Sequence, residues 1–197
     1  MDNMIKEAIL SVLPVPEQYW HKVEPLISVS KIPAKILLLQ EGEVSNRLYF
    51  IVQGALRLFF IKEDGAEYTS QFFFENQIVA SVESFLERQP SRAFLETLEE
   101  SIVCIIKFHN LTEIISLHED LQKWYLAYLK NRLIYYTKSH SSFILDSPEK
   151  RYLKLIEDQP FILERVPHYY IASYLGVTPV SLSRIRKRIK NKGINKG

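Results

Sequence analysis

The apolar positions of this chain change their spacing three times along its length. Between about Ser28 and Asn76, short apolar runs are separated by turn residues that lie 11 or 12 positions apart, at Gly42, Gly54, Gly65 and Asn76. This regular spacing, with β-branched and aromatic residues in the runs, predicts the strands of an all-β sandwich or barrel. The dipeptide Asp64-Gly65 between two such runs predicts a hairpin turn.

The barrel pattern continues after an interruption. We expect two further strands, at 92–98 and 102–107, and a helical turn at 81–87 between the two groups of strands. An insertion of this kind between the strands of a β-roll is a common place for a small-molecule pocket. Before the barrel, Ile5, Ile9 and Val12 share one side of an amphipathic N-terminal helix.

A long helix is predicted from Asp120 to about Leu145, with two apolar stripes. One stripe contains Leu121, Tyr125, Tyr128, Arg132 and Tyr135, and the other contains Leu126, Leu129, Leu133, Tyr136 and His140. One stripe can pack on the barrel while the other meets an identical helix, as in a two-stranded coiled coil. The alternative is one helix buried within a monomer. The presence of two stripes favours a homodimer through residues 120–145.

Residues 146–148, Asp-Ser-Pro, end the long helix and start another, because Asp or Ser can cap a helix and Pro fits its first turn. A helix over 149–158 follows, and 161–166 is short and compatible with a strand. We therefore expect three parts: a β-roll domain (1–117), a dimerisation helix (118–146) and a helical C-terminal domain (147–197).

Two short helices joined by a tight turn are predicted between Val166 and Arg188. Gly176 suits the positive φ at which a helix often ends. Thr178 can then cap the second helix, with Pro179 at its first position. Apolar positions lie at helical spacing in both helices: Ile171, Ala172 and Leu175, then Leu182 and Ile185. This is the pattern of a helix-turn-helix that reads a DNA major groove, and a simple αα corner is the alternative.

Charge favours the DNA-binding interpretation. Seven Lys or Arg and no acid stand between Arg184 and Gly197, whereas the whole chain has a net charge of only +2. The rest of the chain is therefore net acidic. A basic cluster beside a candidate recognition helix is what binding to phosphates requires.

Composition excludes several classes of protein. The apolar content of 47% and charged content of 24% are ordinary for a soluble globular protein of 197 residues. No signal peptide or membrane span is visible, so we expect a cytoplasmic protein without a membrane partner. Cys104 lies in an apolar run, which predicts a buried, inert thiol. The five histidines have no close pairing that indicates a metal site.

The order of these elements resembles the Crp/Fnr family of bacterial transcription regulators. RLYFIVQGALRLFF is similar to the family's paired strands, QIVASVESFLERQPSRA stands at its phosphate-binding cassette, and HYYIASYLGVTPVSLSRIRKR is similar to its helix-turn-helix. The last segment is similar to a Bacteroidetes-type branch. The resemblance implies an α+β protein with a jelly-roll (double-stranded β-helix) sensory domain, a long dimerisation helix and a winged helix-turn-helix. Its partners would be double-stranded DNA and RNA polymerase.

The resemblance also implies roles for residues of the second helix. The family's base-reading positions fall on Pro179, Val180 and Arg184, and Arg184 can contact both O6 and N7 of a guanine. Pro179 has no N–H to donate, whereas Val180 can touch a thymine methyl, and Ser183 is a further base-reading candidate. The candidates for phosphate contacts are Thr178, Ser181, Lys187 and Arg188.

The effector site implied by the resemblance is altered. The family's ribose-binding glutamate position falls at Ser81, with Glu83 nearby, and its phosphate arginine at Arg92. Ala93 stands where the family has a hydroxyl. The residues therefore favour a small anionic or nucleotide-like effector other than cyclic AMP, or a roll that acts only as a scaffold. A structural ion pair of Arg92 with Glu83 or Glu87 is an equal alternative.

Three functions remain open from the sequence. The first is a dimeric DNA-binding regulator that is not an enzyme. The second is a nucleotide-binding module whose C-terminal domain docks a protein. The third is a cupin-type barrel enzyme, which needs a cluster of His and Glu to hold a metal. The run 32–107 contains no histidine, which disfavours the third.

Overall fold

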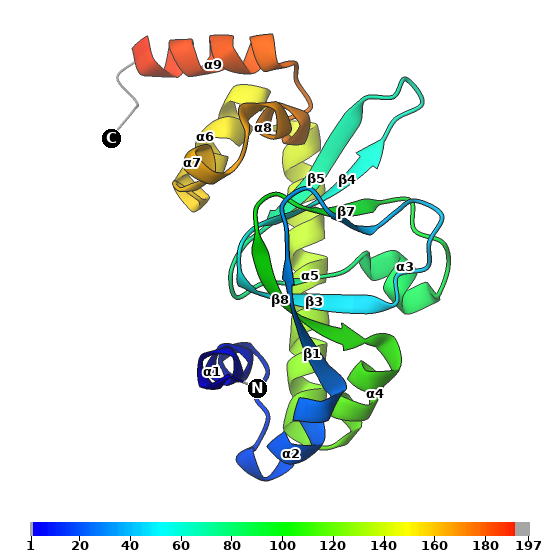
Figure 1. Ribbon diagram of the computed structural model, residues 1–197. Helices are drawn as coiled ribbons and strands as arrows, with labels where there is room; N and C mark the ends of the chain where they lie inside the picture. The colour runs from blue at the N-terminus through cyan, green and yellow to red at the C-terminus, as the bar shows by residue number, and fades with distance from the viewer. Residues whose placement is uncertain (1, 192–197) are drawn as a thin grey trace. The chain divides into compact units, whose positions relative to one another are not determined.

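Strands of alternating burial build the N-terminal part of the protein. In the computed structural model, which describes residues 2–191, eight strands pair into two four-stranded antiparallel sheets (Figure 1). The strands are β1 (Ile27–Ile32), β2 (Leu37–Leu39), β3 (Arg47–Gln53), β4 (Leu56–Ile61), β5 (Glu67–Phe73), β6 (Ile78–Val79), β7 (Phe94–Thr97) and β8 (Ser101–Lys107). The predicted barrel strands are confirmed, and the run before Gly42 contributes the short β2.

The two sheets form the predicted jelly roll. One has the order β1-β8-β3-β6, and the other has the order β2-β7-β4-β5. In the first, Tyr49 of β3 lies opposite Ile105 on one side and Val79 on the other. Side chains from both sheets share one apolar cluster, which includes Leu39, Ile51, Leu56, Phe73, Leu95 and Val103. The strands β1–β8 are called the β-roll below.

Turn residues join the strands as their chemistry predicts. Gly65 has φ +80° at the β4–β5 turn, where the Asp64 side chain accepts a hydrogen bond from the N–H of Ala66 over 2.9 Å. Gly54 joins β3 to β4 with φ +108°, and a Cβ built on it would lie 2.7 Å from the Cα of Ser101. Glycine is therefore required at position 54 for both conformation and space.

Contacts within the chain divide it into two units. The first unit contains residues up to 60 together with 71–134, and the second contains 61–70 together with the residues from 135 onward. The second unit thus includes the tip of the β4–β5 hairpin. The predicted division at 117 and 146 into three functional parts stays a prediction.

Helices complete the first unit. They are α1 (Asn3–Val12), α2 (Trp20–Val23) with the flanking 3₁₀ turns Glu17–Tyr19 and Glu24–Leu26, α3 (Val82–Glu87) and α4 (Phe108–Ser116). The amphipathic α1 and the turn at α3 were expected, whereas α4 was not. A second apolar cluster joins Ile9, Phe50, Ile114 and Cys104. Burial raises the pKa of the Cys104 thiol to about 11, so the thiol is protonated at neutral pH, as an inert buried cysteine should be.

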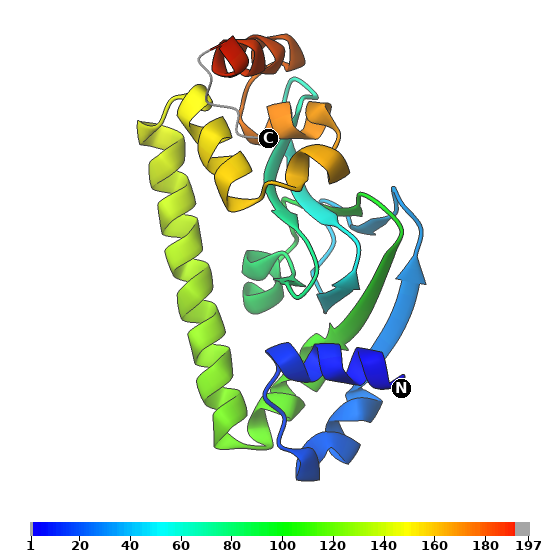
Figure 2. The same cartoon turned by 90° about the vertical axis from the view of Figure 1, so that its left-hand side faces the viewer.

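The long helix α5 (Glu119–Leu145) confirms the prediction of a continuous helix over this segment. It has 27 residues and runs from the end of α4 to the start of α6 (Figure 2). Its first stripe begins with the fully buried Leu121, while Leu126 and Leu133 of the second stripe are 69% and 68% exposed. Among residues 2–191, no helix is both long and apolar enough to cross a membrane.

The second unit consists of the hairpin tip, the C-terminal part of α5 and four further helices in the described residues. These four helices are α6 (Pro148–Asp158), α7 (Ile162–Arg165), α8 (His168–Tyr174) and α9 (Pro179–Asn191). Ser147 caps α6 by accepting a hydrogen bond from the N–H of Lys150, as predicted. The buried core of these helices consists of Tyr152, Leu155, Ile162, Val166, Ile171, Ala172, Leu175, Leu182, Ile185 and Ile189.

One local prediction in this unit was wrong. Within 161–166, residues Ile162–Arg165 form the short helix α7, and no strand forms there. Ile162 within it is fully buried, so packing against the other helices outweighs the β preference of the segment. Between 135 and 191 the structure has only helices, so the wing that the resemblance implies is not found there.

Candidate nucleic-acid interface and effector site

The helix-turn-helix predicted from the sequence is present in α8 and α9. Ile171, Ala172 and Leu175 are each fully buried. Gly176 follows with φ +67°, and the N–H of the next residue, Val177, donates to the carbonyl of Ala172 over 3.0 Å. This glycine closes the end of α8 because a left-handed residue lets the chain satisfy the last carbonyls of the helix.

Helix α9 begins with the predicted cap. The Thr178 hydroxyl accepts a hydrogen bond from the N–H of Ser181 over 3.2 Å, and Pro179 occupies the first helical position. The cap satisfies a backbone donor that would otherwise point to solvent at the start of the helix. Local chemistry therefore determines where the candidate recognition helix starts.

The two faces of α9 differ in polarity. Leu182, Ile185 and Ile189 are buried at helical spacing. The three base-reading candidates, Val180, Ser183 and Arg184, are all exposed on the opposite side, and Val180 is 61% exposed. Positions three and four apart on a helix share a face, so the structure brings these three side chains together on one surface.

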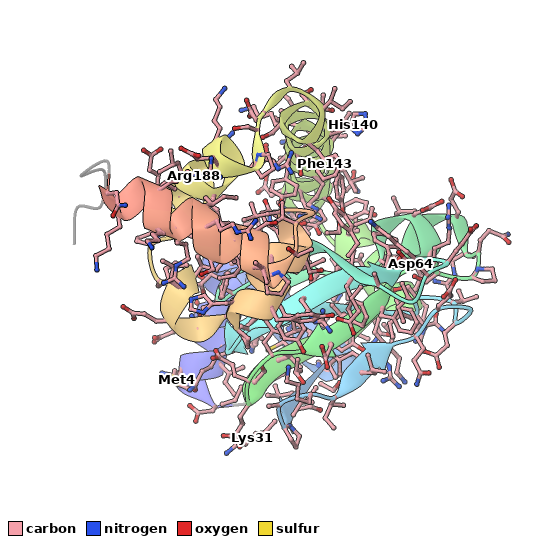
Figure 3. All side chains as sticks on the ribbon, turned by 90° about the horizontal axis from the view of Figure 1, so that it is seen from above. Met4, Lys31, Asp64, His140, Phe143 and Arg188 are labelled. Carbon is pink, nitrogen blue, oxygen red and sulfur yellow. The ribbon has the colours of Figure 1, made fainter. Side chains whose placement is uncertain are left out.

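The phosphate candidates have different surroundings. Lys187 is exposed, whereas the Thr178 hydroxyl, besides capping, lies 3.0 Å from the Ser181 hydroxyl. Arg188, labelled in Figure 3 on α9, forms an ion pair with Glu149 across 3.4 Å. Lys192 and Lys196 of the basic cluster lie outside the described residues. Of these four candidates, Arg188 is the one whose charge is shared with an acid of the protein.

A contact between α8 and α9 involves a histidine. Arg186 Nη1 lies 2.7 Å from His168 Nε2. The guanidinium is a donor only, so the imidazole nitrogen accepts and the ring is neutral in this arrangement. Partial burial, and then the charge of Arg186, lowers the pKa of His168 below its ordinary value of 6.5. Arg186 thus fastens the two helices and is not simply part of the basic cluster.

Arg151 joins three elements of the second unit. Its Nη1 donates to the carbonyls of Phe143 and Asp146 at the end of α5, each over 3.0 Å, and its Nη2 donates to the carbonyl of Leu175 at the end of α8. The guanidinium also lies 4.7 Å from the centre of the Phe143 ring. Sequence reasoning missed this residue because its partners are backbone carbonyls, which have no sequence signature.

The hairpin tip is joined to α8 by a second polar contact. The N–H of Thr69 donates to the hydroxyl of Ser173 over 2.8 Å, and that hydroxyl lies 2.8 Å from the carbonyl of Glu67. Thr69 is fully buried and Ser173 is 9% exposed. Because a buried hydroxyl has to be hydrogen-bonded, Ser173 specifies how the tip packs on the helix-turn-helix.

The effector candidates lie around α3. Ser81 is buried and its hydroxyl accepts a hydrogen bond from the Ser91 hydroxyl over 2.9 Å. Glu83 and Arg92 are exposed, and the expected alternative, an ion pair of Arg92 with Glu83 or Glu87, is not seen in residues 2–191. The structure therefore leaves Arg92 accessible from solvent, whereas the Ser81 hydroxyl is already hydrogen-bonded to Ser91.

The contact between Arg132 and Gln71, near the interior of the β-roll, was not predicted from the sequence. Arg132 Nη2 of α5 donates to the Gln71 side chain over 3.0 Å, and its guanidinium lies 5.5 Å from the Phe73 ring. Phe73 belongs to the apolar cluster of the roll. Arg132 was predicted as a stripe residue, but its heptad-like position did not reveal that it contacts β5. Within residues 2–191 the structure contains no group of three or more His, Cys, Asp or Glu arranged to hold a metal.

Comparison with known proteins found a family model that matches the β-roll. Residues 29–118 match the family model of the cyclic nucleotide-binding domain. This part of the chain is similar to a cyclic nucleotide-binding domain. The match begins within β1 and ends between α4 and α5, so it covers the two sheets and α3.

Curated relatives agree with this assignment. The cAMP-activated global transcriptional regulator CRP of Escherichia coli O6:H1 is 24% identical over 105 residues, which is 53% of this chain and 50% of that protein. The chain thus matches only half the length of this relative. The anaerobic regulatory protein of Pasteurella multocida is 24% identical over 191 residues, covering 90% of this chain and 69% of the relative. The first relative is named as a transcriptional regulator and the second as a regulatory protein.

Solved structures show the same fold over both units. The c-di-GMP responsive global regulator CLP of Xanthomonas campestris superposes with a TM-score of 0.73 at 16% identity, covering 92% of this chain and 96% of CLP. FixK2 of Bradyrhizobium japonicum gives 0.74 at 15% identity, covering 87% and 88%. The chain therefore has the fold of these two regulators. The more specific prediction of a Bacteroidetes-type branch stays a prediction.

Proposed function

We propose that this protein is a dimeric, sequence-specific DNA-binding transcription regulator, with α9 as the recognition helix. One observation carries the proposal: Val180, Ser183 and Arg184 share the exposed face of α9, opposite the buried Leu182 and Ile185. A helix whose inner face is fixed by the core and whose outer face presents a guanidinium suits a DNA major groove.

Arg184 is the principal base-reading residue in this proposal. Its guanidinium can donate two hydrogen bonds to one guanine, and such a bidentate contact discriminates against the wrong base by about 1–3 kcal/mol. Val180 would contact a thymine methyl and Ser183 would add a hydrogen bond. Thr178, Ser181, Lys187 and Arg188 would bind phosphates, which position the helix without reading sequence.

The dimer would form through the second stripe of α5. Leu126 and Leu133, seven residues apart, are among the most exposed large apolar side chains in the described part of the chain. A second copy of the helix would bury them, since a heptad repeat keeps such a stripe facing its partner. The two recognition helices would then lie about 34 Å apart, which is one turn of DNA. RNA polymerase is a further proposed partner.

The β-roll would sense a small anionic or nucleotide-like effector, or would act as a scaffold. Arg92 is exposed and available for an anion, whereas Ser81 replaces the expected glutamate and is bonded to Ser91. These features disfavour cyclic AMP. Calorimetric titration with cyclic AMP and cyclic di-GMP, on wild type and Arg92→Ala, would test this part directly.

The experiment for DNA binding uses a duplex selected from a random pool by the purified protein. Fluorescence anisotropy then measures its affinity and that of a scrambled duplex at moderate salt. We expect Arg184→Ala to bind the selected duplex as weakly as the scrambled one while weak, salt-sensitive binding remains. Ser183→Ala is the matched control on the same face and should retain most of the preference.

Two results would contradict the proposal. Equal loss of binding to all sequences in Arg184→Ala would remove base reading from this residue. If the wild-type protein retained no duplex at moderate salt, DNA binding itself would be wrong. The C-terminal helices would then serve as a docking surface for another protein.

A further inference from the structure

The second unit contains a cavity that is separate from the candidate effector site of the β-roll. It has a volume of about 310 Å³, and its wall includes three tyrosines, two lysines and an amide: Tyr68, Tyr135, Tyr174, Lys138, Lys154 and Gln159. These residues come from the hairpin tip, α5, α6 and α8. The volume is at the lower end of the range for small-molecule sites.

The charges around the cavity favour an anion. Lys138, Lys154 and Arg151 line it, with Asp158 as the acid in the wall. Burial raises the pKa values of Tyr68 and Tyr174, so these phenols stay neutral at pH 7 and add no negative charge. Lys138 and Lys154 are both exposed to solvent. A carboxylate or sulfonate can therefore form charge-assisted hydrogen bonds with them while it keeps part of its hydration.

The rings in the wall favour a flat apolar body. Tyr68 and Phe143 meet edge to face, with ring centres 5.7 Å apart. Phe143 is 46% exposed although it belongs to this aromatic pair. A planar ligand could cover its free surface and that of Tyr68, since aromatic rings bind one another through stacked or edge-on contacts.

The wall also holds a polar atom that lacks a partner. Gln159 Oε1 is buried and has no hydrogen-bond donor in the part of the chain that the structure describes. An unsatisfied buried acceptor is costly, so a small turn of this amide toward a donor in the cavity would be favourable. A ligand with an N–H or O–H beside its aromatic ring would therefore gain a hydrogen bond to Gln159. An aromatic anion without such a donor can still bind through its ring and its charge.

We propose that this cavity is a binding site for a small aromatic monoanion, such as an arylcarboxylate. Its ring lies against Tyr68 and Phe143, and its anionic group lies between Lys138 and Lys154. Arg151 is part of the wall and also holds the ends of α5 and α8 together. Binding of a ligand in the cavity therefore affects the helix-turn-helix through Arg151. Only this last consequence rests on the DNA-binding function proposed above.

The binding test uses 2-naphthoate as the probe and the full chain without DNA. Isothermal titration should give saturable binding with one site per chain. The double variant Lys138→Ala/Lys154→Ala should bind about tenfold more weakly or worse, because both charge-assisted contacts are lost. Lys130→Ala, an exposed lysine of α5 outside the cavity, is the matched control and should bind as wild type.

Ligand controls separate the two parts of the recognition. Neutral 2-naphthamide tests the charge and cyclohexanecarboxylate tests the ring, and both should bind more weakly than 2-naphthoate. Equal binding by wild type and the double variant would overturn the site. Loss of 2-naphthoate binding in Arg92→Ala, with the double variant unaffected, would also overturn it and assign the anion to the roll.

The regulatory consequence has its own readout. DNA affinity is measured by anisotropy with and without saturating 2-naphthoate, in wild type and in the double variant. A shift confined to wild type supports coupling through Arg151. Binding of 2-naphthoate with unchanged DNA affinity overturns the coupling and leaves the site. Absence of DNA binding in every sample contradicts the proposed function alone, because the titration needs no DNA.

Discussion

Arg151, in the first turn of α6, donates a hydrogen bond from Nη2 to the carbonyl oxygen of Leu175 across 2.6 Å. Leu175 is the C-cap residue of α8, the first helix of the helix-turn-helix. Through its other terminal nitrogen, the same guanidinium holds the carbonyls of Phe143 and Asp146. One side chain thus fastens the end of the long helix to the element that carries the recognition helix.

Replacing Arg151 by lysine should destabilise the second unit. A single ammonium group cannot match the planar fork that serves three carbonyls, so we expect a loss of about 1.5–3 kcal/mol in the free energy of unfolding. Urea denaturation followed by circular dichroism measures it. Arg184→Lys, an exposed arginine of α9, is the matched control and should change stability by about 0.5 kcal/mol or less. Equal losses of unfolding free energy in Arg151→Lys and Arg184→Lys would show that the hydrogen bonds of Arg151 do not stabilise the second unit.

Gly54 should tolerate no side chain. A Cβ there would lie 2.2 Å from the Ser101 hydroxyl oxygen, in addition to the strain of φ +108°. Overpacking and a left-handed backbone together predict that Gly54→Ala destabilises the first unit by about 2–5 kcal/mol. Gly42→Ala has positive φ but no atom within 4 Å of its Cβ, so it should cost only about 1–2 kcal/mol. Thermal unfolding of the two variants checks the difference, and similar midpoints would refute the steric argument.

Charge on the second stripe of α5 should separate the subunits. Leu126→Glu and Leu133→Glu together would place four carboxylates in the interface of a symmetric dimer, which predicts a monomer at micromolar concentration. Light scattering coupled to size-exclusion chromatography gives the mass. Asn131→Glu, an exposed position on the side of α5 opposite this stripe, should stay dimeric. A wild-type protein that is monomeric in this assay would remove the dimer from the proposal.

Acid should loosen the contact between α8 and α9. The folded-state pKa of His168 is lowered by partial burial and by Arg186, so the contact stabilises the fold fully above the ordinary value of 6.5. That stability is lost as pH falls below 6.5 toward the lowered pKa, because protonation favours the unfolded state. We expect the melting temperature of wild type to fall more steeply between pH 7.5 and 5.5 than that of His168→Gln. Parallel curves would count against the contact.

Lys187 should bind DNA without reading it. Loss of one phosphate contact per subunit lowers affinity for all sequences alike and reduces the slope of log affinity against log salt by about 1 for each contact. Anisotropy at several salt concentrations, with selected and scrambled duplexes, provides the measurement for Lys187→Ala. A change in sequence preference without a change in salt slope would instead make Lys187 a base-reading residue.

Local patterns predicted most of the elements. Asp64-Gly65 predicted the β4–β5 turn, Ser147-Pro148 predicted the start of α6, and Gly176 predicted the end of α8. Each of these signals acts over a few residues, through a cap, a turn or a positive φ. Helix α4 was missed although Leu111 and Ile114 lie three apart, because it follows β8 without a turn residue between them.

The sequence by itself determined a β-sandwich or barrel, the long helix and the helix-turn-helix, since apolar spacing and turn chemistry are local properties. It also placed Val180, Ser183 and Arg184 on one face of α9. Only the tertiary structure decided that Ile162–Arg165 are helical, that Ser81 is hydrogen-bonded to Ser91 and that Arg151 donates to three carbonyls. The physical reason is that a backbone carbonyl or a buried hydroxyl carries no periodic signal, so its partner is known only when distant segments meet.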